Sequence, residues 1–62
     1  MKRKNLIKRL KDAGWYLHKH GSNHDIYTNG IDLEPIPRHR EINEQLAKAI
    51  IKRRHLRADD IQ

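Results

Sequence analysis

The sequence lacks cysteine and phenylalanine altogether, and among its 62 residues it has only one tryptophan and two tyrosines. The absence of cysteine excludes disulfide bonds and thiolate metal ligands. Because only 35% of the residues are apolar, the core must come mainly from leucine, isoleucine, alanine and Trp15. A chain this short buries a smaller share of its surface than a larger protein does. We therefore expect residues 1–62 to form a single domain without a deep enclosed pocket.

Long hydrophobic runs are also missing. No apolar stretch approaches the roughly 20 residues that a membrane-spanning helix needs. The basic N-terminal segment leads into an amphipathic pattern rather than into the apolar core of a signal peptide. We therefore expect a soluble, cytoplasmic protein.

Charge is abundant and unbalanced. The chain has 14 lysines and arginines against 8 aspartates and glutamates, which gives a formal charge of +6 and a pI near 10.1. Such an excess in so short a chain favours a polyanion, such as nucleic acid, or an acidic protein as partner. The alternative is a basic surface that serves only solubility.

Two segments have helical periodicity. The first runs from Lys2 to Ala13, with one apolar stripe, and Gly14 directly after it is typical of a helix C-terminus. The second runs from Glu41 to Arg54. The stripe of the first helix is Leu6, Ile7, Leu10 and Ala13, and that of the second is Ile42, Leu46, Ala49 and Ile50. Ile51 points away from the second stripe. We expect the tail residues Leu56 and Ile61 to cover it, and the alternative is that it is left open for a partner.

Three short stretches between the helices are typical of strands. Alternation over Trp15–His20 predicts a first strand with Trp15 and Leu17 toward the helices and Tyr16, His18 and His20 on the other side. The second strand is expected over His24–Thr28, with Ile26 toward the helices. Asn29-Gly30 predicts a two-residue type I′ hairpin.

The third strand is expected over Ile31–Ile36. Pro35 lacks a backbone N–H, so this strand should be an edge strand or end there. The sequence therefore predicts an α+β fold in the order α-β-β-β-α, with a three-stranded antiparallel sheet and both helices on one face.

The corner Gly21-Ser22-Asn23 precedes His24, which is the strongest candidate for a catalytic residue. Glycine accepts positive φ, and serine and asparagine can bond their own backbone, so a tight turn is expected. An imidazole that leaves such a turn at the end of a sheet could transfer protons near neutral pH. The alternative is a turn histidine that only bonds a neighbouring carbonyl. Alternation places His24 on the side of Ile26, so it must lie beyond the helices or be turned outward by a bulge.

Taken together, these features resemble the HicA mRNA interferase toxins. The resemblance rests on the short helix, the aromatic residue after its closing glycine, Gly21-Ser22-Asn23-His24, the Asn29-Gly30 hairpin, the Pro37-Arg38-His39 connector and the terminal helix. It implies a fold like that of double-stranded-RNA-binding domains, RNA cleavage, and a HicB antitoxin in a type II toxin-antitoxin pair. It also places the single catalytic histidine of the family on His24.

RNA carries its own nucleophile, the 2′-OH, so its cleavage needs a proton acceptor, a proton donor and cations, but no metal ion or other cofactor. His24 is the expected general base or acid. The basic residues Lys19, Arg38 and Arg40, together with His39, are candidates for holding RNA. The second proton carrier stays open among His20, His39 and Tyr27.

Other functions fit parts of the sequence. A metal site built from His18, His20 and either His24 or His39 is disfavoured, because alternation separates His24 from the other two. A non-catalytic RNA-binding module would also need a basic face. A subunit that only docks an acidic partner would bind no RNA.

Overall fold

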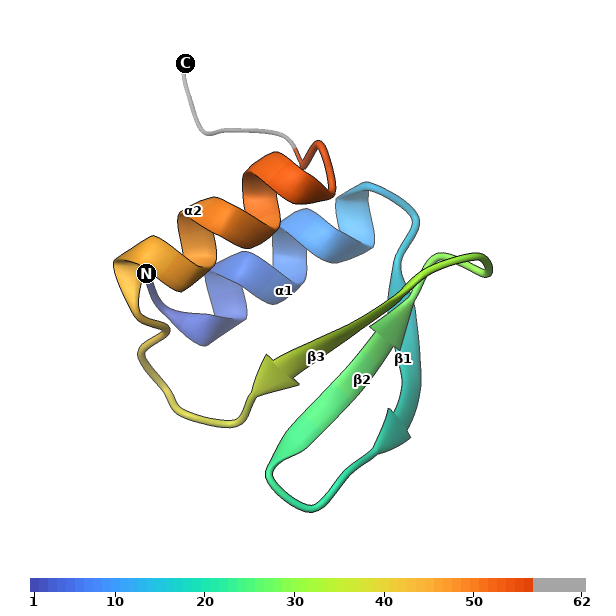
Figure 1. The fold of residues 1–62 in the computed structure, drawn as a ribbon, viewed down its shortest axis with the longest axis horizontal. Helices are drawn as coiled ribbons and strands as arrows, with labels where there is room; N and C mark the ends of the chain where they lie inside the picture. Colours follow the sequence, from blue (N-terminus) through green and yellow to red (C-terminus); the bar gives the residue numbers. More distant parts are fainter. Residues whose placement is uncertain (57–62) are drawn as a thin grey trace.

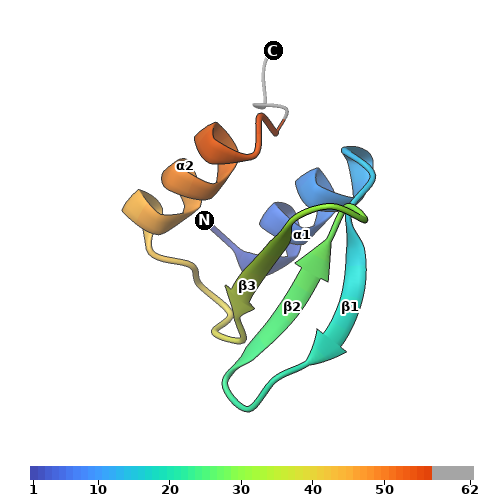
Figure 2. The same cartoon turned by 45° about the vertical axis from the view of Figure 1, so that its right-hand side comes forward.

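The computed structural model describes residues 1–56, which form two helices and one sheet (Figure 1). Along the chain the elements are α1 (Arg3–Asp12), β1 (Tyr16–His20), β2 (His24–Thr28), β3 (Leu33–Pro37) and α2 (Glu44–Arg53). The strands are antiparallel in the order β1-β2-β3. The two helices lie side by side on one face of the sheet (Figures 1 and 2). The predicted α-β-β-β-α fold is confirmed.

Helix α1 presents its apolar stripe to the core, as predicted. Leu6, Ile7 and Leu10 are buried. The helix ends at Asp12, and Gly14 follows with a φ of +91°, a conformation that glycine adopts without the strain of a side chain. Ala13, predicted to belong to the stripe, is instead exposed at the C-cap.

The central strand β2 has the predicted bounds, but its side chains lie on the opposite faces of the sheet from those predicted. Asp25 and Tyr27 are buried beneath the helices, whereas Ile26 is only half-buried on the open face. The expectation that Ile26 faces the helices is therefore wrong. Because His24 shares the face of Ile26, it lies exposed on the open side of the sheet without any bulge in its own strand.

A β-bulge occurs instead in the edge strand β1. Leu17 pairs with Tyr27 and Lys19 pairs with Ile26, so His18 is an extra residue between them. The extra residue reverses the alternation that follows. His20, predicted for the open face, therefore pairs with Asp25 on the helix side.

The beginning of β1 follows the prediction only in part. Trp15 is buried just before the strand, as expected. Leu17 shares the helix-facing side of its pairing partner Tyr27, but it is 40% exposed at the edge of the sheet. The aromatic ring of Trp15 is thus the main contribution of this segment to the core.

The loop between β2 and β3 is longer than predicted. Thr28 pairs with Leu33, which leaves residues 29–32 as the connection. The Asn29 side-chain oxygen accepts hydrogen bonds from the backbone N–H groups of Ile31 and Asp32. Gly30 has a positive φ but Asn29 does not, and a type I′ turn requires both. The two-residue hairpin is therefore wrong, and β3 begins at Leu33, whereas the edge position expected from Pro35 is confirmed.

Helix α2 begins three residues later than predicted. The Asn43 side chain caps it by accepting hydrogen bonds from the backbone N–H groups of Gln45 and Leu46. This start places Ala47 and Ile50 in the core and leaves Leu46 and Ala49 exposed, contrary to the predicted stripe.

Three further apolar residues complete the packing around α2. Ile42 is buried just before the helix, and Leu56 is buried just after it. Ile51 is partly buried against the core, and its carbonyl accepts a hydrogen bond from the Leu56 N–H. Ile61, also expected to cover Ile51, lies outside the described residues.

A buried carboxylate fastens β3 to the end of α2. Glu34 is 4% exposed, and its two oxygens accept hydrogen bonds from Arg53 at 2.9 Å and Arg54 at 2.8 Å. Arg54 also donates to the Leu33 carbonyl and lies 5.3 Å from the centre of the Trp15 ring. Its guanidinium therefore connects the sheet, the helix and the core.

We expect the Glu34→Gln substitution to lower the free energy of unfolding by about 1.5–3 kcal/mol, since it weakens two charge-assisted hydrogen bonds in a buried place. Urea denaturation measures this change. The control is Asp32→Asn, because Asp32 is half exposed and lies 3.7 Å from Arg54. That exposed pair should contribute less than about 1 kcal/mol. Equal losses in the two variants would contradict the role given to Glu34.

Candidate functional site

The loop that precedes His24 closes through one tight backbone contact. The Gly21 N–H donates to the His24 carbonyl at 2.7 Å. A Cβ on Gly21 would lie 2.7 Å from that same oxygen, which is too close for any side chain. The predicted turn is thus present. Its glycine is needed for this close approach rather than for positive φ, which Gly21 does not have.

Asp25, the residue after His24, joins three parts of the molecule. It is 8% exposed and lies beneath the helices. Its Oδ2 accepts a hydrogen bond from Arg3 of α1 at 2.6 Å. Its Oδ1 lies 2.9 Å from Nε of Arg38 and 2.8 Å from Nδ1 of His20. One carboxylate therefore holds α1, the end of β1 and the connector after β3 around the start of β2.

Arg38 fixes the loop to this carboxylate. While its Nε donates to Asp25, its two terminal nitrogens donate to the carbonyl oxygens of Gly21 and Ser22. Arg38 was predicted to hold phosphate, but its guanidinium is engaged with protein groups. It acts here as a positioning residue that sets the path of the chain into His24.

Asp25 and Arg3 were missed by sequence reasoning. Neighbouring residues of a strand lie on opposite faces of the sheet, so the prediction that Ile26 faces the helices placed Asp25 on the open face. Its ion pair with Arg3 was therefore not expected. The available clue was the composition of the strand itself. A carboxylate followed by a tyrosine at the next alternate position fits an inward face, provided that arginines are near enough to pair with the carboxylate.

The pKa of Asp25 lies below its ordinary value. The hydrogen bond with His20 is the largest cause, and the hydrogen bond and charge of Arg38 act in the same direction, whereas burial opposes them. Asp25 is therefore ionised near neutral pH and accepts hydrogen bonds from all its partners.

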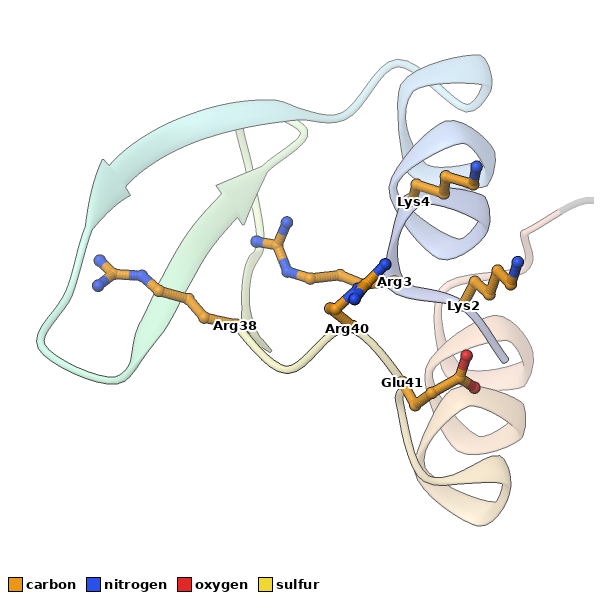
Figure 3. Close-up of a pocket in the computed structure, with 6 residues that line it drawn as sticks. All are labelled: Lys2, Arg3, Lys4, Arg38, Arg40 and Glu41. Atoms are coloured by element: carbon orange, nitrogen blue, oxygen red, sulfur yellow. The ribbon is translucent and has the colours of Figure 1, made fainter.

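A basic pocket of about 600 Å³ adjoins this network (Figure 3). Its lining residues come from the start of α1 and from the connector: Lys2, Arg3, Lys4, Arg38, Arg40 and Glu41. Backbone hydrogen bonds bring the two segments together, from Arg3 N–H to the Arg40 carbonyl at 2.8 Å and from Ile42 N–H to the Met1 carbonyl at 2.8 Å. Arg40, predicted to hold RNA, therefore lies among other cations.

The remaining predicted residues lie at different places. Lys19 pairs with Ile26, so its side chain shares the open face with His24. His39 is exposed in the connector. Tyr27 is 6% exposed within the core, a poor position for a proton carrier. Within residues 1–56, no three histidine, aspartate or glutamate side chains gather into a group that could hold a metal ion.

Comparison with known proteins adds one finding. The model of a family described as "HicA toxin of bacterial toxin-antitoxin" matches residues 3–56. This range includes the loop, His24, the Asp25 network and both helices. Searches of curated proteins and of solved structures each gave no match. Neither helix in the described part of the chain has the length and apolar character needed to cross a membrane.

The close approach at Gly21 predicts that Gly21→Ala destabilises the protein by about 1–3 kcal/mol, because the loop must shift to admit the methyl group. Chemical denaturation measures the loss, and the NMR signals of His24 report the shift. Ser22→Ala is the matched control, since Ser22 is exposed and bonds Arg38 only through its carbonyl. It should change stability by no more than about 0.5 kcal/mol. Identical behaviour of the two variants would count against the close contact.

The lowered pKa of Asp25 predicts a loss of stability in acid. The stabilisation is complete above the ordinary carboxyl pKa of about 3.9, and it disappears as the pH falls through the lower pKa of the folded state. Thermal unfolding between about pH 5 and pH 2 should therefore show a falling Tm. Part of this slope should be absent in Asp25→Asn and retained in Asp12→Asn, whose carboxylate is exposed. An unchanged slope in Asp25→Asn would exclude Asp25 as its source.

Proposed function

Because this chain belongs to the family of HicA toxins of bacterial toxin-antitoxin systems, we propose that it is an endoribonuclease that cleaves mRNA through the imidazole of His24. The proposal includes inhibition by a HicB-type antitoxin, action in the cytoplasm and no requirement for a metal ion. The observation that carries it is the placement of His24: an exposed histidine at the start of the central strand, on a loop held by Arg38 and Asp25.

The proposed reaction is a transesterification within the RNA strand. The 2′-oxygen attacks the adjacent phosphorus, and the bond from phosphorus to the 5′-oxygen breaks. The products are a 2′,3′-cyclic phosphate and a 5′-hydroxyl. His24 either accepts the proton of the 2′-OH as general base or donates a proton to the leaving 5′-oxygen as general acid.

The surroundings of His24 support such a role. A proton carrier must hold a stable position relative to the reacting atoms. The loop supplies this constraint through the bond from Gly21 to the His24 carbonyl and through the bonds of Arg38 to Gly21 and Ser22. Lys19 on the same face contributes positive charge for a phosphate.

Two exposed histidines are candidates for the second proton carrier. His20 lies 2.8 Å from Asp25 through Nδ1, which orients its ring and leaves Nε2 for another partner. His39 has no side-chain hydrogen bond within residues 1–56. His20 lies on the helix side of the sheet with Asp25, opposite the face of His24, and His39 lies in the connector, so both stay candidates.

The positive charge supports an acidic antitoxin. The chain has a formal charge of +6. An antitoxin of opposite charge would be attracted to the chain and, by covering His24, would block the reaction.

A second candidate function is RNA binding without cleavage. The fold, which is like that of double-stranded-RNA-binding domains, and the basic pocket favour it. The two functions differ at His24, because a binding module does not need this imidazole.

We expect His24→Ala to reduce the rate of RNA cleavage by about 10²–10⁴-fold, the contribution typical of a positioned proton carrier. Purified protein is assayed on RNA in the presence of EDTA, and the 2′,3′-cyclic phosphate is identified at the new end. In growing cells the same substitution should abolish the arrest of growth.

The control for this experiment is His18→Ala, which removes an exposed imidazole at the bulge in β1. It should leave cleavage close to the wild-type rate. Retained toxicity in His24→Ala would contradict the catalytic role. Loss of wild-type cleavage in EDTA would show that a metal ion is required.

A further inference from the structure

The basic pocket beside the loop contains more positive charge than its own carboxylates balance. Arg3 and Arg38 share the single carboxylate of Asp25. Glu41 lies 3.8 Å from the Met1 nitrogen. Among residues 1–56, the side chains of Lys2, Lys4 and Arg40 have no hydrogen bond or ion pair. Three cations around one hollow are thus available to an external anion.

The framework of the pocket is held by the backbone rather than by these side chains. Lys2 and Glu41 form an antiparallel bridge, and the Arg3 N–H donates to the Arg40 carbonyl. The N–H groups of Asn5 and Leu6 bond the Lys2 carbonyl at the start of α1. Figure 3 shows Lys2 and Lys4 extending from the start of α1 and Arg40 from the neighbouring connector, with Arg38 on the side of the sheet.

The pocket is joined to the loop before His24 through Arg38. His24 pairs with Pro37 across the strands, and Arg38, the next residue, lines the pocket. Arg38 also bonds the two carbonyl groups of the loop before His24. His24 lies on the open face, so an RNA strand whose scissile phosphate lies at His24 would pass the end of the sheet at Arg38 before it reaches Arg40 and the two lysines.

We infer that this pocket binds the backbone phosphates of RNA on one side of the cleaved bond. The inference rests on the proposed function for the location of the cleaved bond. The chemistry of the lining favours RNA over a protein partner. All six lining residues are charged, and none is one of the aromatic residues that, with arginine, are enriched in the cores of protein interfaces. Lysine and arginine without such anchors are typical of phosphate contacts that position a strand without recognising its sequence.

The test compares two variants that each lose two positive charges. Lys4→Gln/Arg40→Gln alters the pocket, whereas Lys48→Gln/Lys52→Gln alters exposed residues of α2 that do not line it. The probe is a single-stranded 2′-O-methyl oligonucleotide, which cannot be cleaved because its 2′-oxygen carries no proton. Binding is measured over a range of salt concentrations, and chemical denaturation confirms that both variants are folded.

We expect the pocket variant to bind more weakly and to have a shallower salt dependence. Each lost phosphate contact should reduce the slope of log K against log salt by about 0.7, so the slope should fall by about 1.4. The α2 variant should keep most of the wild-type slope. On cleavable RNA, the pocket variant should have a raised KM and an unchanged kcat, because these contacts act on binding alone.

The outcomes separate this inference from the proposed function. If the wild type cleaves RNA and both variants show the same slope, the pocket inference is overturned and the nuclease proposal stands. If the wild type does not cleave RNA, the nuclease proposal fails, and the oligonucleotide still tests the pocket. If the pocket variant binds the oligonucleotide like wild type but binds poly-glutamate more weakly, the pocket is a site for acidic polypeptides and the inference is overturned.

Discussion

The ion pairs of Asp25 are the interaction on which the rest of this small structure depends. Its carboxylate lies beneath the helices and meets a guanidinium from α1, another from the connector, and the His20 ring at the end of β1. A buried carboxylate without such partners would be strongly unfavourable. The start of β2 is therefore held in place by charge, at the very position where His24 leaves the sheet.

The same principle operates at the other end of the inward face. Tyr27 pairs with Glu34, and Glu34 meets two arginines from the end of α2. Only a small set of aliphatic side chains, such as Leu6, Leu10, Ile36 and Ile50, is fully enclosed between these ends. A chain of 62 residues cannot bury a large apolar core. Arginine-carboxylate pairs at both ends supplement the core and fix the helices relative to the sheet.

The order of elements and the family were predictable from sequence, because helical periodicity, turn residues and the motif ending in His24 are local features. Facing was not. Ile26 is expected inside and Asp25 outside on the assumption that apolar residues are buried. Three polar partners reverse that preference, and two of them, Arg3 and Arg38, are distant from Asp25 in the sequence. No feature of the sequence near His18 predicts the bulge, so the face of the sheet on which His20 lies could not be inferred. As an arginine in a basic segment, Arg38 is expected to bind phosphate. Only its contacts in the structure identify it as a residue that supports the loop.

The bulge in β1 determines which side chains of this strand lie near His24. With His18 present, Lys19 shares the open face with His24 and His20 reaches Asp25. If the same residues paired without the bulge, Lys19 would lie opposite Asp25 and His20 opposite His24, so an ammonium group would approach the buried carboxylate and an imidazole would lie beside His24. The bulge therefore decides which base and which cation lie near the loop.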